Sequence, residues 1–100
     1  MNTVEVSQVR EGTPRKIRNR YGVERTIQID REWSVAVDGK EVGRVRYRMI
    51  RRERVTRRSG VVDARWHVPG WEYEVRDRWV EKPSKKACIE AVLMLARDPE

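Results

Sequence analysis

The chain has 100 residues, of which 39% are charged and 38% hydrophobic, and its formal net charge is +7. This length suits a single domain, 1–100, with one modest core. No apolar run approaches the roughly 18 residues of a membrane span, and no signal peptide is recognisable. We therefore expect a soluble, cytoplasmic protein with no membrane partner. The one cysteine, Cys88, cannot form an internal disulfide and fits a reducing compartment.

The positive charge is unevenly distributed along the chain. Residues 41–60 contain eight arginines and two acidic residues, whereas residues 61–100 have a net charge of −1. A second basic cluster comprises Arg15, Lys16, Arg18 and Arg20. Localised charge of this kind favours a polyanionic partner. The alternative is an ordinary solvated surface, because 18 arginines against five lysines is also what a GC-rich genome encodes.

The first 30 residues allow two interpretations. Residues 3–9 predict a short edge strand, and residues 16–21 and 25–30 are consistent with a hairpin across Tyr21-Gly22. Alternatively, residues 1–24 form a flexible basic arm.

The sheet pattern becomes clear from Trp33. Apolar and polar or small residues alternate from Trp33 to Val37, before the turn signal Asp38-Gly39. A three-residue loop ending at Gly39 would pair Trp33 with Gly43 and place the apolar residues on the same face as Val45. Because burial selects one face, we expect this loop rather than a two-residue turn.

The central strand, residues 43–55, alternates arginine with bulkier residues. Val45, Tyr47 and Met49 occupy one parity. The other parity forms an arginine row that comprises Arg44, Arg46, Arg48, Arg52 and Arg54. Alternate side chains on a strand lie about 6.6 Å apart, which is close to the spacing of phosphates along a nucleic-acid strand. The arginine row is therefore a candidate phosphate-binding surface.

Residues 62–79 predict a second hairpin with Pro69-Gly70 as its turn. This register places Trp66 opposite Tyr73 and pairs acidic with basic residues on the outer face. The outer charges of this hairpin would then neutralise one another, whereas Arg44, Arg46 and Arg48 would lack acidic neighbours in their own hairpin. All four tryptophans would face the core: Trp33, Trp66, Trp71 and Trp79. We therefore expect contacts with the nucleic-acid backbone rather than base stacking.

Residues 84–97 predict a closing helix. Ser84 is a suitable N-cap, and Cys88, Val92 and Leu95 form an apolar stripe for packing on one face of the sheet. Met94 widens the apolar surface, which leaves a homodimer through this helix as an alternative.

Two lysines, Lys85 and Lys86, lie in the first helical turn and oppose the helix dipole. A phosphate held by these lysines and the free N–H groups of the helix start would explain them. The run Ser84-Lys85-Lys86-Ala87 and the hairpin at 37–43 are similar to parts of double-stranded-RNA-binding domains, whose lysines contact phosphates. The chain lacks the first helix of that family. A sheet followed by one helix also resembles the arm-site DNA-binding domains of tyrosine recombinases, and the composition resembles accessory proteins of actinobacterial phages.

No enzyme chemistry is indicated. His67 is the only histidine and lies far from Cys88 in the sequence, so neither a zinc site nor a Cys–His pair is expected. No glycine-rich phosphate loop occurs. We expect no catalytic site, no metal and no cofactor.

The sequence therefore predicts an α+β fold, in which an antiparallel sheet of four to five strands within 32–80 carries the helix 84–97 on one face. It predicts a small basic protein that contacts the backbone of DNA or RNA with weak sequence preference. The candidate contacts are Arg44, Arg46, Arg48, Arg52, Arg54, Lys85, Lys86, Arg15, Lys16, Arg18 and Arg20. The alternative is a phage-type protein-interaction module that binds an acidic host protein or forms a homodimer.

Overall fold

A computed structural model describes residues 3–97; residues 1, 2 and 98–100 of the predicted domain lie outside the described range. The elements are β1 (Val4–Arg10), β2 (Thr13–Arg18), β3 (Glu24–Ile29), β4 (Arg31–Val37), β5 (Lys40–Val55), β6 (Val62–Val75), β7 (Arg78–Lys82) and α1 (Lys85–Arg97). A five-stranded antiparallel sheet has the order β1-β4-β5-β6-β7, and β2 and β3 form a second sheet. The predicted α+β fold is confirmed.

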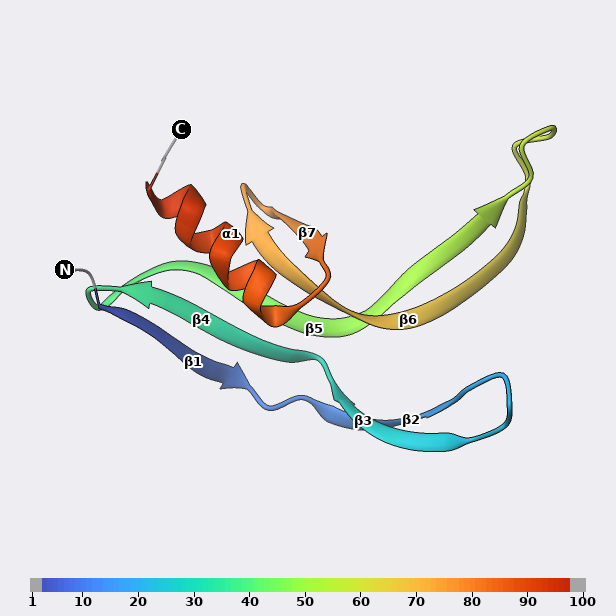
Figure 1. The fold of residues 1–100 in the computed structure, drawn as a ribbon, viewed down its shortest axis with the longest axis horizontal. Coiled ribbons are helices and arrows are strands. Elements are labelled where there is room, and N and C mark those ends of the chain that lie inside the picture. The colour runs from blue at the N-terminus through green and yellow to red at the C-terminus, as the bar shows by residue number, and fades with distance from the viewer. Residues whose placement is uncertain (1–2, 98–100) are drawn as a thin grey trace.

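The core lies between α1 and one face of the larger sheet (Figure 1). Val35, Val45, Cys88 and Val92 are at most 2% exposed and form its centre. The helix begins as predicted, because the Ala87 N–H donates a hydrogen bond of 3.1 Å to Ser84 Oγ. The predicted stripe is shorter than expected, because Leu95 is 41% exposed at the far end of the helix.

Burial makes the Cys88 thiol a probe of folding. Its side chain is fully buried, and burial raises the pKa of the thiol from 9.0 to about 11. At pH 8 only roughly one native thiol in a thousand is a reactive thiolate. We expect the native protein to react at least about 100-fold more slowly with a thiol reagent than the denatured protein does. Equal rates in a stopped-flow comparison would contradict the buried position.

The turn between β4 and β5 differs from the predicted three-residue loop. Val37 pairs with Lys40, so Asp38 and Gly39 form a two-residue turn with both φ values positive. The register then shifts between Val35 and Ala36, because the β5 strand contains a bulge. The bulge pairs Trp33 with Val45. The predicted face of β4 is therefore buried, but a bulge in β5 and not a longer loop produces this register.

The predicted hairpin at Pro69-Gly70 is wrong, because β6 runs through this position without turning. The turn comes later, at Arg76 and Asp77, which both have positive φ. Trp66 consequently lies opposite Arg52 instead of Tyr73. Pro69 is tolerated because β7 pairs with β6 only from Trp71 onwards, so one edge of β6 is free at the proline.

The molecule is elongated because two hairpins project from the same end of the sheet, away from α1 (Figure 1). The Cα radius of gyration is 16.6 Å, compared with about 13 Å for a compact domain of this length. We call residues 13–29 the β2–β3 arm and residues 51–67 the β5–β6 arm. The first arm corresponds to the hairpin interpretation of the N-terminal region.

Candidate nucleic-acid interface

The predicted arginine row starts at Arg44, which is not free of acidic neighbours. Its Nη1 lies 2.6 Å from Glu32 on β4, and its Nε lies 2.8 Å from Glu41 near the β4–β5 turn. These hydrogen bonds, chiefly the one that Arg44 donates to Glu41, raise the pKa of Arg44. The bond from Arg44 also lowers the pKa of Glu41. The prediction that this arginine faces water alone is wrong.

The middle of the row is held by one buried carboxylate. Glu72 is 6% exposed, and its Oε1 accepts hydrogen bonds from Arg46 Nε at 2.8 Å and Arg48 Nε at 2.6 Å. Burial alone would raise the pKa of Glu72, but the bonds from Arg48 and Arg46 outweigh it and lower the pKa. The Arg46 guanidinium also covers the Trp79 ring at 3.9 Å. Trp79 therefore lies on the face opposite α1 and not in the predicted core.

The remaining arginines of the row are also paired. Arg52 binds Glu81 of β7 through both terminal nitrogens, and this bond raises the pKa of Arg52. Arg54 Nε lies 2.9 Å from Asp63 Oδ1. Neither carboxylate is the direct cross-strand partner of its arginine, because Arg52 pairs with Trp66 and Arg54 pairs with Ala64. The row is therefore an ion-pair network, and its surplus charge is small.

The surplus charge of the protein lies on the two arms. The β2–β3 arm contains five basic and one acidic residue, and the β5–β6 arm contains six basic and two acidic residues. Each arm therefore has a net charge of +4. The other 66 residues contain 12 basic and 13 acidic residues, a net charge of −1. The arms, of which the β5–β6 arm includes the paired Arg52 and Arg54, therefore become the candidate interface in place of Arg44, Arg46 and Arg48.

The β2–β3 arm carries cations on both faces. Arg15 and Arg25 share one face with the isoleucines of the arm, whereas Lys16 shares the other with Arg18. Arg18 is paired with Glu24 at 2.6 Å. Within the described chain, no ion pair involves Arg15, Lys16 or Arg25. Three exposed cations of this arm are thus available to an external anion.

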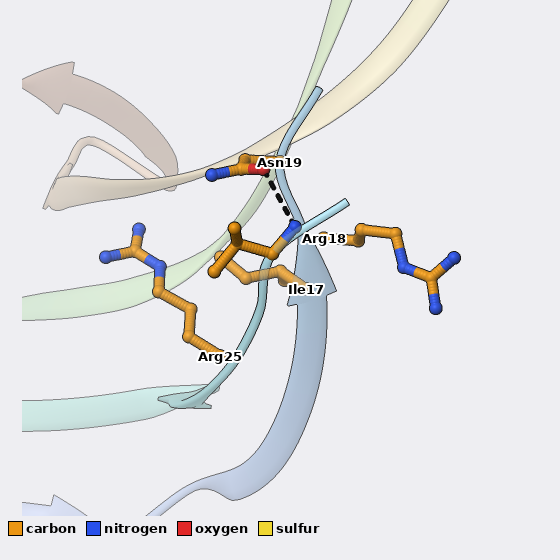
Figure 2. Close-up of a pocket in the computed structure, with 5 residues that line it drawn as sticks. Ile17, Arg18, Asn19 and Arg25 are labelled. Carbon is orange, nitrogen blue, oxygen red and sulfur yellow. Dashed lines mark hydrogen bonds between the residues drawn. The ribbon is translucent and has the colours of Figure 1, made fainter. Parts of the chain in front are cut away.

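Figure 2 shows a hollow near the end of this arm. Ile17 and Val23 provide its apolar lining, and Asn19, Arg18 and Arg25 complete it. Arg18 and Arg25 point away from one another in this view. A ligand that lies along the arm would therefore meet a guanidinium on either face.

The tip of the β2–β3 arm is ordered by Asn19. Its Oδ1 accepts hydrogen bonds from the N–H groups of Tyr21 at 2.9 Å and Val23 at 3.0 Å. Gly22 has a φ of 79° and donates to the Asn19 carbonyl. This loop presents Arg20 and Tyr21 outward, with the Arg20 guanidinium 4.9 Å from the centre of the Tyr21 ring.

The tip of the β5–β6 arm is ordered in a similar way. The Gly60 N–H donates to the Thr56 carbonyl at 2.8 Å, and the Thr56 hydroxyl donates to Asp63 at 3.2 Å. Arg57 and Arg58 lie between these anchors, are exposed, and make no ion pair within residues 3–97. Each arm therefore ends in a fixed loop that displays arginine.

The two predicted lysines of α1 lie away from the arms. Lys85 Nζ lies 4.3 Å from the centre of the Trp33 ring, a cation–π contact that explains a cation in the first helical turn without a phosphate. Lys86 is exposed beside it. The helix α1, whose first turn carries both lysines, lies away from the β2–β3 and β5–β6 arms (Figure 1).

Sequence reasoning missed three exposed cations of the arms that make no ion pair within residues 3–97: Arg25, Arg57 and Arg58. The signal for the last two was present, since they immediately precede the turn residues Ser59-Gly60 in the basic segment. A residue displayed by a hairpin tip cannot pair across the sheet as its neighbours do. Position in the turn is therefore a better guide than parity to an unpaired arginine.

The described residues hold neither a metal-binding cluster nor a membrane-spanning helix. Residues 3–97 contain no cluster of three or more His, Cys, Asp or Glu side chains that could hold a metal ion. No helix in that range has the length and apolarity needed to cross a membrane. No known protein family, curated protein or solved structure matches the chain.

Proposed function

We propose that this protein binds the sugar-phosphate backbone of nucleic acid with its two arms. The observation that carries the proposal is the separation of charge, with +4 on each arm and −1 on the remaining residues. The arms project from one end of the sheet (Figure 1), so a single extended polyanion can contact both. A protein that needed only solubility would gain nothing from this concentration of charge.

The chemistry follows from unpaired guanidinium and ammonium groups. Each phosphate that Arg15, Lys16 or Arg25 neutralises releases condensed counterions, so the affinity falls steeply as salt is added. An arginine guanidinium group forms bidentate hydrogen bonds with two phosphate oxygens. These contacts carry no sequence information by themselves, so binding has weak sequence preference. The paired arginines of β5 contribute little, because an incoming phosphate must compete with Glu72 and the other carboxylates.

The test compares two triple variants with the same change of charge. The arm variant is Arg15→Gln/Lys16→Gln/Arg25→Gln, and the body variant replaces three exposed cations outside the arms: Lys40→Gln/Arg78→Gln/Arg97→Gln. Fluorescence anisotropy with labelled oligonucleotides between about 50 and about 200 mM salt gives the slope of log K against log salt. We expect the arm variant to lose about 2 to 3 units of this slope, and the body variant to keep it.

Two outcomes contradict the proposal. One is the absence of binding by the wild type at the lowest salt. The other is equal weakening by both triple variants, which would mean that total charge and not the arms attracts the ligand.

A protein-interaction module is the second candidate, and the outer surface of α1 favours it. Met94 is 69% exposed and Leu95 41% exposed. A hollow beside Met94 is lined also by Glu90, Leu93 and Arg97. A sizing column with light scattering tests a homodimer through this helix, since Met94→Lys should abolish the dimer. The two candidates separate cleanly, because that substitution leaves the arms unchanged.

A further inference from the structure

We infer that Trp66 and Tyr21 stack on unpaired bases, so that the ligand of the arms is single-stranded nucleic acid. This inference rests on the proposed function and makes it more specific. Its basis is the position of one exposed aromatic ring on each basic arm.

Trp66 differs from the other three tryptophans in having an open ring. Trp33 is 4% exposed, and its ring is covered by the cations of Arg31 and Lys85. The Trp71 ring packs against the Trp33 ring, with 5.3 Å between the ring centres, and against the Tyr47 ring at 4.6 Å. Arg46 covers Trp79. Within residues 3–97, the Trp66 ring has neither a cationic nor an aromatic partner, and the residue is 45% exposed. A two-stranded arm has no second layer to bury it.

Trp66 is surrounded by basic residues of the β5–β6 arm. It lies opposite Arg52 and next to Arg65, on an arm with a net charge of +4. Single exposed apolar residues are common on protein surfaces. An indole on a basic arm, however, matches the two parts of a nucleotide, since the ring stacks on the base and the unpaired arginines of the same arm, Arg57 and Arg58, meet the phosphates.

Tyr21 repeats this arrangement on the β2–β3 arm. It is 75% exposed at the tip, and Arg20 Nη2 donates a hydrogen bond of 2.8 Å to its hydroxyl. The Arg20 guanidinium lies over one side of the ring at 4.9 Å. The other side is free for a base, and the Asn19 hydrogen bonds fix the loop before any ligand arrives. Preorganisation of this kind lowers the entropic cost of binding.

Base faces are accessible only in a single strand. In a duplex each base is covered by its stacked neighbours, so an aromatic side chain reaches a face only by unstacking it. Stacking also tolerates any base, because every base has a π face. The two open rings therefore point to single-stranded DNA or RNA bound without sequence preference.

The test measures wild-type affinity for three labelled probes of about 30 nucleotides: oligothymidylate, an abasic oligomer with the same backbone, and a duplex. We expect oligothymidylate to bind about 10-fold or more tighter than the abasic oligomer. Trp66→Ala should weaken the oligothymidylate complex by about 5- to 100-fold and leave the abasic complex unchanged. Trp66→Tyr, which keeps a ring, should retain most of the affinity.

The outcomes distinguish this inference from the proposed function. Equal wild-type affinity for the thymidylate and abasic oligomers overturns stacking but leaves phosphate binding by the arms intact. Tighter binding of the duplex overturns the single-stranded assignment. No binding to any probe overturns the proposed function itself. The wild-type comparison needs no variant, so it decides the question even if Trp66→Ala disturbs the β5–β6 arm.

Discussion

Replacing Glu72 by glutamine is expected to lower the free energy of unfolding by about 3 kcal/mol. Glu72 is 6% exposed, and the same carboxylate oxygen accepts hydrogen bonds from Arg46 and Arg48. The amide of glutamine carries no negative charge, so two adjacent guanidinium groups would repel each other without compensation. This loss of stability lies at the low end of the range for breaking a buried ion pair, because the side chains of both arginines remain partly exposed to water. Urea unfolding at pH 7 measures it.

The pH dependence of the same variant checks the cause. The pKa of Glu72 is lowered from 4.5 in the folded protein, so the carboxylate stabilises the fold above that value. This stabilisation is lost as the pH falls through the lowered pKa. We therefore expect the difference between wild type and Glu72→Gln to shrink on acidification below about pH 4.5. A difference that stays constant would show that the glutamine disrupts packing instead.

Glu74 supplies the matched control for Glu72. It lies two residues further along β6 on the same face, but it is exposed. Glu74→Gln removes the same charge from the same strand, and surface substitutions of this kind change stability by no more than about 0.5 kcal/mol. If Glu74→Gln were as destabilising as Glu72→Gln, the buried ion-pair network would not be the source of the effect.

Much of the fold follows from patterns that are local in the sequence. The helix was predictable because Ser84 caps it and the apolar stripe has the helical period. The two strands that form the core were predictable because alternation fixes which face of β4 is buried, even though a bulge rather than a longer loop produces the pairing. Local propensity and burial agree in these segments.

The candidate site could not be predicted in the same way, because ion pairing is decided by sheet register. Arg46 and Glu72 are 26 residues apart in the sequence, and their contact depends on β6 continuing through Pro69-Gly70. Interpreting that dipeptide as a turn moves Glu72 to a different partner and leaves the arginine row apparently bare. The same error places Trp66 in the core. The single error at Pro69-Gly70 therefore made the ion-paired arginines of β5 look unpaired and made the exposed Trp66 look buried.

Gly43→Ala is expected to lower the free energy of unfolding by about 1 to 3 kcal/mol. A Cβ added to Gly43 would lie 2.6 Å from Cγ1 and 3.2 Å from Cγ2 of Val92, a residue that is 2% exposed. Neither the β-branched side chain nor the helix that carries it can yield without loss of packing. In a strand without this contact, replacing glycine would stabilise the protein by about 0.5 to 1 kcal/mol. The sign of the change in urea unfolding is therefore diagnostic.

A double-mutant cycle with Val92→Ala isolates the contact. Val92→Ala alone removes buried surface and should cost about 1.5 to 3 kcal/mol. In the double variant the new methyl group at position 43 occupies the space left by the valine, so we expect its cost to fall short of the sum by about 1 kcal/mol or more. Met94→Ala, on the same helix at a residue that is 69% exposed, should combine additively with Gly43→Ala. Additivity with Val92→Ala as well would mean that α1 does not rest on β5 at this glycine, and the core would need another explanation.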